Sequence, residues 1–367
     1  MSRGKAFRAW IVAFAALTMV AAACGDSEET TTTTAAPQTT TTAAATTTAA
    51  LGELPEPELD SFTIGDGIPF RAPAGFAPRV AAAEGICEQY GVELIIEDFP
   101  TGAPQALEAG AVDGIIQGGG GIIASMRTTS PNAAVAVFET AMRDLLVAGP
   151  DFPTLESLRG QTMGVASFGG DSHAAVLLAL ESGDVAPEEV TVVQLGGESD
   201  RIAALVAGGV QAIPVDFTAQ QEMEDLGFHV VADLGALDTR LFRAGLHVDR
   251  AFAEENPNTV LVVVACLLEG FQYYFTPEGQ EFIINLWAEG AQRDPEPLRA
   301  VLPRVSESVA AQKCMFIDPA IFETQERVQL LADRTLEDVD STQAADNSFL
   351  ERLQEIGFME KLGITCP

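Results

Sequence analysis

The sequence predicts an α/β protein with two lobes of similar topology and a ligand cleft between them. One observation is the stretch 160–217, where short β-branched runs at 162–165 and 190–193 each lead through a glycine-containing loop into an apolar-periodic helix. This alternation is typical of a parallel sheet, because each crossover between parallel strands needs a helix-length connection. The loops then lie at the carboxyl ends of the strands, where helix N-termini present free N–H groups to a ligand.

A weak internal repeat is the second observation. A shift of 183 − 85 = 98 residues places Gly85 on Gly183 without a gap, and 107–110 (LEAG) on 205–208 (LVAG). Identities of this kind are common in a chain rich in Ala and Gly, but here strands also fall on strands and loops on loops. We therefore expect two βαβαβ lobes whose loops face each other, the alternative being generic α/β similarity without facing lobes.

Length and charge set limits on the function. The 367 residues are enough for two lobes, each with its own core. The 53 acidic and 20 basic residues give a net charge of −33, which argues against nucleic acid or an anionic membrane surface as a partner. Most of this excess is expected to solvate the exterior.

The N-terminus has the pattern of an exported protein. Basic residues up to Arg8 precede an apolar run at 9–23, and Cys24 follows small residues. A helix of about 15 residues spans roughly 22 Å, short of the roughly 30 Å of a bilayer core, so 1–23 is predicted to be a signal peptide. The run resembles the lipobox of bacterial lipoproteins, which implies lipidation of Cys24. The alternative is an ordinary secreted protein with an incidental cysteine.

A change in composition marks the next segment. Residues 24–59 contain a Thr/Ala tract at 30–50 and a run of Glu and Pro at 53–58. Such a composition cannot build a packed core, and it predicts a flexible, lipid-anchored linker.

The folded part begins with alternating elements: strands at 61–65, 92–98 and 113–117, and helices at about 76–90 and after Thr101. The third strand runs into four glycines, Gly118 to Gly121, which allow the backbone to approach a ligand closely at a helix start. A merely loose loop is the alternative.

Further strands are expected at 133–138, 145–148, 228–232 and 241–248, the last returning toward the first lobe. Asn256 and Pro257 begin a helix with an apolar stripe. The aromatic residues at 271–275 have helical spacing and are expected in the core rather than as a stacking platform. The remaining helices are predicted at 278–289, 296–303, 319–335 and 346–362.

With these elements in order, the chain resembles the substrate-binding lipoproteins of ABC importers, in the branch serving sulfonates, taurine, nitrate and thiamine-precursor pyrimidines. The resemblance covers about 60–290 and is carried by parts of 77–85, by 107–113 (LEAGAVD), 155–165 (LESLRGQTMGV), 201–208 (RIAALVAG) and 254–257 (EENP). It implies a type II periplasmic-binding-protein fold, with lobe 1 at 60–145 plus 276–367 and lobe 2 at 146–275.

The resemblance also implies delivery of a small molecule to a membrane permease driven by an ATPase, and it implies loop positions that contact the ligand. Glu139 joins them as an acid near the same loops. The predicted ligand-binding residues are Asp66, Phe70, Arg71, Thr101, Gly102, Gly118, Gly119, Gly120, Glu139, Ser167, Phe168, Gly169, Gly170, Gly197, Glu198, Asp216 and Phe217. The four consecutive glycines and the acid at Asp216 depart from the usual pattern, which leaves the ligand class open.

The predicted loops favour one kind of ligand. Asp216, if it faces the cleft, suits a cationic or amide-bearing nitrogenous ligand, and Phe70, Phe168 and Phe217 could enclose a flat ring. Capping alone accounts for acids at helix starts, such as Glu198. A planar nitrogenous ligand is therefore expected, with a sulfonate or similar oxyanion as the alternative bound through cations such as Arg71, Arg127 and Arg143.

The cysteine and histidine positions predict no metal site and no cofactor. Cys87 and Cys266 lie in apolar segments and are expected to be buried thiols. Export permits a disulfide between Cys314 and Cys366, although the sequence alone does not decide it.

We expect a non-catalytic, monomeric solute receptor, lipid-anchored to the outer face of the cytoplasmic membrane and working with an ABC permease. One alternative is an exported enzyme with Ser167 or Ser172 as nucleophile and His173 as base, although neighbouring residues on a helix point apart. A surface-anchored sensor that uses the same cleft is the other.

Overall fold

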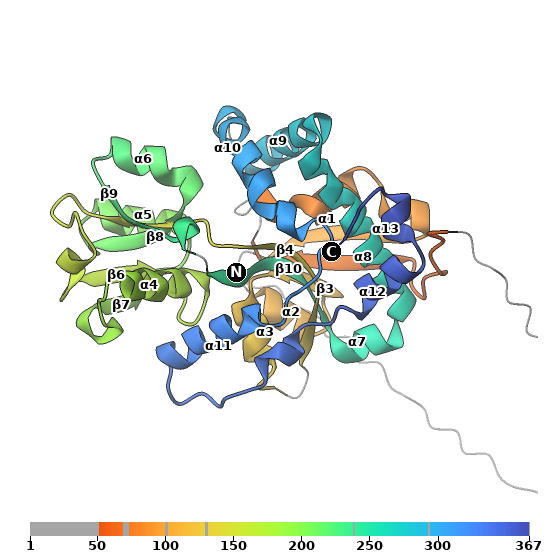
Figure 1. Ribbon diagram of the computed structural model, residues 1–367, viewed down its shortest axis with the longest axis horizontal. Helices are drawn as coiled ribbons and strands as arrows, with labels where there is room; N and C mark the ends of the chain where they lie inside the picture. The colour runs from red at the N-terminus through yellow and green to blue at the C-terminus, as the bar shows by residue number, and fades with distance from the viewer. Residues whose placement is uncertain are drawn as a thin grey trace, which may run out of the picture. The chain divides into compact units, whose positions relative to one another are not determined.

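The computed structural model describes residues 51–68, 73–99, 102–128, 131–237, 239–292 and 294–366. The predictions for the signal peptide, Cys24, Phe70, Arg71 and Thr101 lie outside these residues. The described part holds two five-stranded mixed sheets, one in each of two α/β lobes (Figure 1). The predicted fold class is confirmed.

The first sheet has the order β2-β1-β3-β10-β4. β1 pairs in parallel with β2 and β3, and β10 pairs antiparallel with β3 and β4. Its strands are β1 (Ser61–Asp66), β2 (Glu93–Asp98), β3 (Gly114–Gln117), β4 (Asn132–Ala141) and β10 (Arg240–Asp249). The helices between them are α1 (Ala77–Ala83), α2 (Ala103–Glu108) and α3 (Gly119–Ser125).

The second sheet, of order β7-β6-β8-β5-β9, repeats this pattern. β6 is parallel to β7 and β8, and β5 is antiparallel to β8 and β9. Its strands are β5 (Asp144–Ala148), β6 (Thr162–Val165), β7 (Thr191–Gln194), β8 (Ala212–Asp216) and β9 (His229–Asp233), and its helices are α4 (Asp171–Ser182), α5 (Glu198–Val206) and α6 (Gln220–Asp225).

The starts of equivalent strands differ by 191 − 93 = 98 and 212 − 114 = 98 residues. The sequence repeat therefore aligns β2 with β7 and β3 with β8, and the two lobes share one topology as predicted.

The strand predicted at 241–248 returns to the first sheet as β10. β10 lies between β3 and β4, and α8 (Pro257–Phe271) packs against α1. Residues 240–275, predicted in lobe 2, thus contact first-lobe elements. The strand pairing favours a second lobe of 144–237 in place of the predicted 146–275.

α8 is a core helix. The stretch Pro257–Phe275 is the one helical segment among the described residues that is long and apolar enough to cross a membrane, but 72% of its most apolar part is buried inside the protein. Tyr274 is fully buried and its hydroxyl accepts a hydrogen bond from the Phe76 backbone N–H at 3.1 Å. Phe271 and Tyr274 belong to the core, as predicted, whereas Phe275 is 37% exposed.

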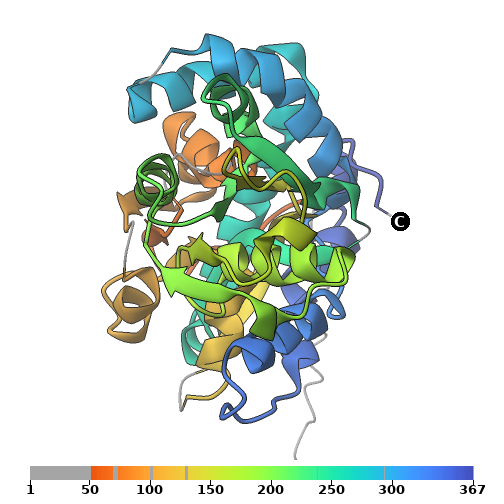
Figure 2. The same ribbon diagram turned by 90° about the vertical axis from the view of Figure 1, so that its left-hand side faces the viewer.

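The C-terminal region adds helices on both sides of the second lobe. α11 contacts α4, and α10 contacts 217–219, so that the two helices flank this lobe in Figure 2. The prediction at 346–362 is split at Gly357, whose φ of +78° ends one helix before the next. The remaining helices are α7 (Arg250–Glu255), α9 (Pro277–Ala291), α10 (Glu296–Val309), α11 (Ile321–Ala332), α12 (Ser348–Glu355) and α13 (Phe358–Lys361).

Two further links hold the ends of the described part. A disulfide joins Cys314 to Cys366, while Cys87 and Cys266 are buried free thiols. The Glu58 carboxylate accepts a hydrogen bond from the Thr259 backbone N–H at 2.7 Å. The end of the predicted linker therefore contacts the first lobe.

Candidate functional site

Glycine loops from the two lobes meet. A Cβ atom placed on Gly118 would lie 2.4 Å from Oδ2 of Asp171, and one on Gly120 would lie 3.1 Å from the carbonyl oxygen of Gly169. The glycines before and within α3 thus allow the start of α3 to approach the loop 167–170 before α4. Of the predicted ligand-binding residues, the structure brings those of these two loops together.

Beside these loops lies a buried arginine on the connection from β4 to β5. Arg143 donates to Glu139, with Nη2 3.1 Å from Oε2, and its Nη1 lies 3.3 Å from Oδ2 of Asp216. Its guanidinium also stands over the ring of Phe217 at 5.5 Å. Burial opposes the charge, but the carboxylates of Asp216 and Glu139 raise the pKa of Arg143 above its ordinary value.

A second buried arginine crosses between the lobes. Arg243 of β10 places Nη2 2.9 Å from Oδ2 of Asp144 and Nη1 3.6 Å from Oδ2 of Asp171. Burial raises the pKa of Asp171 to about 6, against the opposing effect of Arg243. Burial also raises the pKa of Asp144. Both carboxylates are held in place by a residue of the other lobe.

The start of α5 is fixed to the end of β8. Oε2 of Glu198 accepts a hydrogen bond from the Asp216 backbone N–H at 2.9 Å, and Arg201 donates to the carbonyl oxygens of Pro214 and Gly196. Burial raises the pKa of Glu198. Glu198, Asp216 and the N-cap Gly197 therefore lie at one edge of the sheet.

α11 adds residues that sequence reasoning missed. The Gln325 side chain is 0% exposed, and its Nε2 would lie 3.4 Å from a Cβ on Gly120. One turn later, Gln329 donates to the Gly120 carbonyl oxygen at 2.5 Å and accepts from Arg127 at 2.8 Å. The sequence signal was a glutamine pair four residues apart on a helix face that otherwise carries Ile321 and Phe322.

Several polar atoms at this junction have no hydrogen-bond partner. They include both amide atoms of Gln325, Oε1 of Gln117 and Nε of Arg243, and these four atoms are buried. The Gln325 side chain still helps to lower the pKa of Asp171, although its amide atoms form no hydrogen bond of acceptable geometry. Buried polar atoms are normally hydrogen-bonded, so this group suits a ligand that supplies the missing partners.

Some predicted residues have structural partners instead. Oδ2 of Asp66 pairs with Arg79 at 2.7 Å and Oδ1 accepts from the Ile68 backbone N–H at 2.9 Å. Burial raises the pKa of this carboxyl group. Gly102 has a φ of +84° at the start of α2. No contact brings Asp66 or Gly102 to the residues around Arg143 and Arg243 among those the structure describes.

The aromatic residues differ in exposure. Phe168 is 55% exposed and meets the ring of His173 edge-on, with ring centroids 5.5 Å apart. Phe217 is buried beneath Arg143. Phe168 is therefore free to cover a flat ligand, whereas Phe217 supports the arginine.

The serine and histidine of the enzyme hypothesis hold the loop before α4. Oγ of Ser172 accepts from the Ala166 backbone N–H at 2.8 Å, and Nδ1 of His173 accepts from the Gly169 backbone N–H at 3.0 Å. Burial lowers the pKa of His173. In the described ranges, no group of three or more His, Cys, Asp or Glu residues could hold a metal ion.

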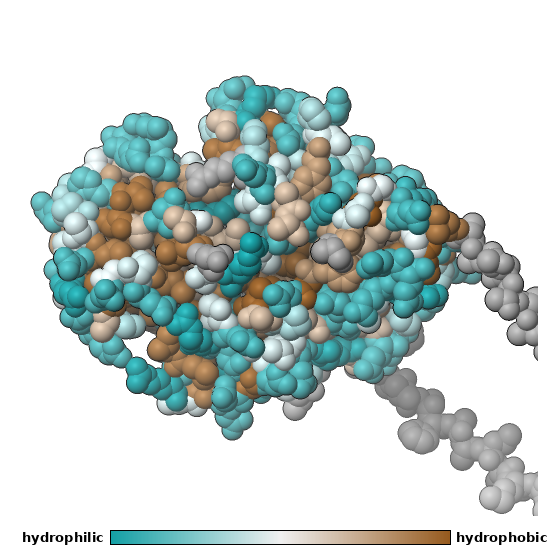
Figure 3. Space-filling view, in the orientation of Figure 1, coloured by the Kyte–Doolittle hydropathy of each residue, from teal (hydrophilic) through white to brown (hydrophobic). Residues whose placement is uncertain are grey.

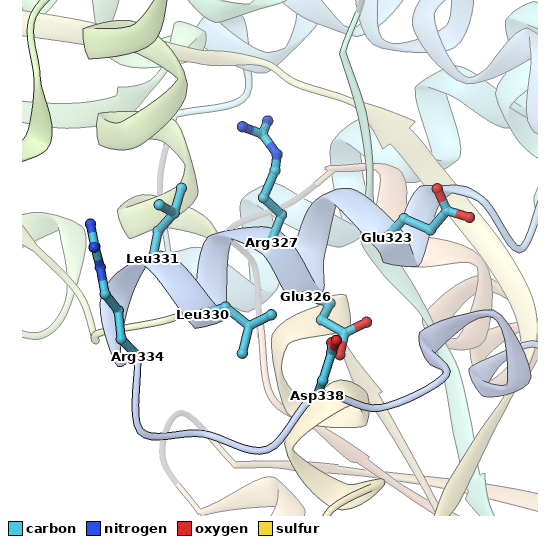
Figure 4. Close-up of a pocket in the computed structure, with 7 residues that line it drawn as sticks. All are labelled: Glu323, Glu326, Arg327, Leu330, Leu331, Arg334 and Asp338. Atoms are coloured by element: carbon cyan, nitrogen blue, oxygen red, sulfur yellow. The ribbon is translucent and has the colours of Figure 1, made fainter.

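A surface pocket lies on the face of α11 that carries Arg327 and Arg334 (Figure 4). Its arginines pair with acids of the second lobe, Arg327 with Glu181 at 3.2 Å and Arg334 with Glu188 at 2.9 Å. The surface is also indented between α6 and α10 in Figure 3. The pocket lining is Glu323, Glu326, Arg327, Leu330, Leu331, Arg334 and Asp338.

Comparison with known proteins supports a binding-protein fold. No family model matches the chain. The riboflavin-binding protein RibY of Chloroflexus aurantiacus is 26% identical over 219 residues, which cover 58% of this chain and 62% of that protein. The chain thus matches less than two thirds of the length of this curated relative.

Solved structures share the fold at low identity. The aliphatic sulphonate-binding protein SsuA of Escherichia coli has a TM-score of 0.63 at 18% identity, covering 80% of this chain and 99% of that chain. The nitrate-binding protein NrtA of Synechocystis PCC 6803 has a TM-score of 0.64 at 12% identity, covering 85% and 92%. The desulfurization enzyme DszB has a TM-score of 0.57 at 16% identity, covering 81% and 99%. The chain has the fold of periplasmic binding proteins.

Proposed function

We propose that the protein captures a small molecule between its two lobes outside the cytoplasm and delivers it to an ABC import permease. The observation that carries this function is the junction where the glycine loops of two topologically equivalent lobes meet, with buried polar atoms that lack partners. The resemblance to ABC-importer binding proteins and the shared fold of SsuA and NrtA support it.

The ligand we propose is a planar nitrogenous compound. RibY is a riboflavin-binding protein, and the exposed Phe168 offers a ring face beside the loop before α4. The ion pairs of the junction join five carboxylates to three guanidiniums, which disfavours an added anion. These groups are Glu139, Asp144, Asp171, Glu198 and Asp216 with Arg143, Arg201 and Arg243.

The Asp216 carboxylate is paired within the protein. The preference of Asp216 for a cationic ligand depends on a carboxylate that faces the cleft, but Arg143 lies 3.3 Å from it and Thr218 donates its backbone N–H to Oδ1 at 3.0 Å. Its preference for a cationic ligand is correspondingly reduced. A sulfonate or similar oxyanion is the second candidate, supported by the SsuA fold and the unpartnered Nε of Arg243.

The remaining features of the proposal concern location and assembly. A signal peptide at 1–23 and lipidation of Cys24 would hold a monomer at the outer face of the cytoplasmic membrane. We propose no catalytic role, because Ser172 and His173 are both used to hold a loop. The partners would be the permease and its ATPase.

A thermal-shift screen of the mature chain tests this function. The panel contains riboflavin, lumichrome, thymine, taurine, an alkanesulfonate and nitrate. A ligand that binds the folded state alone raises its melting temperature, and saturation at 100 times Kd corresponds to about 2.7 kcal/mol. We expect a saturable shift with a flat nitrogenous compound, confirmed by calorimetric titration with one site. If none of the compounds in the panel raises the melting temperature, the proposal is contradicted.

A further inference from the structure

Gln325 is the most enclosed polar side chain at the junction. It is 0% exposed, neither Oε1 nor Nε2 makes a hydrogen bond, and the side chain lies close enough to Asp171 to lower the pKa of that carboxyl group. It lies beside Gly120 of the first lobe, whose Cβ position is also 3.6 Å from Cα of Gly170 of the second lobe. The amide therefore stands where the two glycine loops meet.

The neighbouring Gln329 shows that this environment can supply hydrogen-bond partners to both atoms of a buried amide. Gln329 lies one turn later on α11, is also buried, and has both amide atoms hydrogen-bonded, to Gly120 and Arg127. A buried amide without partners destabilises the folded protein, whereas an apolar residue of the same shape does not. Gln325 is thus a buried residue whose two amide atoms make no hydrogen bond, and whose side chain has the carboxylate of Asp171 as a polar neighbour.

An amide side chain presents one kind of recognition pattern. Its carbonyl oxygen accepts and its NH₂ donates, side by side in one plane. A sulfonate or nitrate only accepts, and would leave Oε1 of Gln325 unpaired. A ring lactam or imide carries an N–H next to a C=O in the same plane and can satisfy both atoms. A ring edge of this type complements Gln325 better than an oxyanion does.

We infer that Gln325 is a specificity-determining residue of the ligand site, and that it pairs with a cyclic amide or imide edge of a flat heterocycle. This inference rests on the proposed function and narrows its ligand class. Two further buried atoms without hydrogen-bond partners are Oε1 of Gln117, at the end of β3, and Nε of Arg243, whose Nη1 lies 3.6 Å from Asp171. α11 contacts both α3 and α4, so its Gln325 side chain would contact the edge of a ligand bound at the junction.

The experiment uses riboflavin and 3-methylriboflavin, whose ring N–H is replaced by N–CH₃, on the mature chain. We expect the wild-type protein to bind riboflavin about tenfold more tightly than the methylated compound, because methylation removes one donor and leaves Oε1 of Gln325 unpaired. Gln325→Met should weaken riboflavin binding about tenfold and reduce the difference between the two compounds to less than about threefold.

Gln312 provides the matched control. It is a buried glutamine with an unpartnered Oε1, but it lies at 310–312 of the first lobe rather than at the glycine loops. Both Gln325→Met and Gln312→Met should raise the melting temperature of the ligand-free protein, and Gln312→Met should leave riboflavin binding unchanged.

Three results with the two flavins and Gln325→Met would overturn the inference. The first is equal riboflavin affinity in the wild type and Gln325→Met, and the second is equal wild-type affinity for the two flavins, a test that needs no substitution. The third is a lower melting temperature in ligand-free Gln325→Met, which would make Gln325 a structural residue. Binding of an oxyanion instead of riboflavin refutes the inference and leaves the transport function standing. If no compound in the panel binds, both the inference about Gln325 and the proposed transport function are refuted.

Discussion

Two sets of ion pairs link the lobes, and they differ in burial. At the junction, the side chains of Arg143 and Arg243 are 5% and 12% exposed. On the outer face of α11, those of Arg327 and Arg334 are 47% and 74% exposed. The chemistry is the same in both sets, but water screens the outer pairs and not the inner ones.

The difference indicates distinct roles. A buried pair fixes geometry, because removal of one partner leaves an uncompensated charge away from water. An exposed pair can separate with little change in free energy, so the outer face of α11 can follow a movement of the second lobe. The junction, by contrast, is expected to be sensitive to single-atom changes. The predictions below test this contrast in order of decreasing effect.

The largest effect is expected for Arg143→Met. The substitution leaves Glu139 buried without its cation, and should lower the free energy of unfolding by about 3–5 kcal/mol. Urea denaturation followed by circular dichroism measures this loss. The double variant Glu139→Gln/Arg143→Met should recover part of it, because the unpaired charge is then absent. Equal stabilities of wild type and Arg143→Met would show that the pair has no such role.

A smaller effect concerns Asp171. Its pKa is about 6 in the folded protein against an ordinary value of 3.8, so the folded state binds this proton more tightly than the unfolded state. The contribution of Asp171 to stability is therefore greatest at low pH and is lost as pH rises from about 4 to 6. Asp171→Asn should be about 2 kcal/mol more stable than wild type above about pH 6, with the difference vanishing below about pH 4.

Urea denaturation of both proteins at a series of pH values measures this difference. A difference between the two proteins that stayed constant across the range would contradict the raised pKa. The loss of the long contact between Asp171 and Arg243, at 3.6 Å, reduces the gain in Asp171→Asn but does not change its dependence on pH.

The close approach of the glycine loops gives a third prediction. In Gly120→Ala the new Cβ would lie 3.1 Å from the Gly169 carbonyl oxygen, so the loops must separate slightly. We expect a loss of about 1 kcal/mol in ligand binding, measured by calorimetric titration. Gly209→Ala is the control, since its Cβ meets only the Ala204 carbonyl oxygen, at 3.4 Å. A larger loss of binding in the control would argue against contact at the junction.

The smallest effect is expected on the outer face. Arg327→Ala removes the exposed pair with Glu181 and should change the free energy of unfolding by less than about 1 kcal/mol. Denaturation at low and high salt measures this change, and high salt should reduce it further. A loss as large as that of Arg143→Met would remove the contrast between the two sets of ion pairs.

The sequence predicted elements whose signals are local. The 98-residue offset placed β2 on β7 and β3 on β8, because equivalent strands and loops keep equal spacing. The glycines after β3 were recognised because a close backbone approach requires that residue type. These features follow from short-range patterns in the chain.

Long-range pairing escaped prediction. The partners Arg143 and Asp216 are 73 residues apart (216 − 143), and only the sheet brings them together. Asp66 meets Arg79 of α1, but no pattern shows which way either side chain points. Gln325 lies about 200 residues from Gly120, so no local pattern places it at the same junction.

Hydrogen–deuterium exchange with mass spectrometry tests the central claim most directly. The mature chain is compared with and without the compound that gives the largest thermal shift. If the ligand lies between the lobes, the loops at 117–121 and 167–171 and the inner face of α11 should gain protection together, because one molecule contacts all three. Protection in one lobe alone, or confined to the outer-face pocket around Arg327 and Arg334, would contradict it.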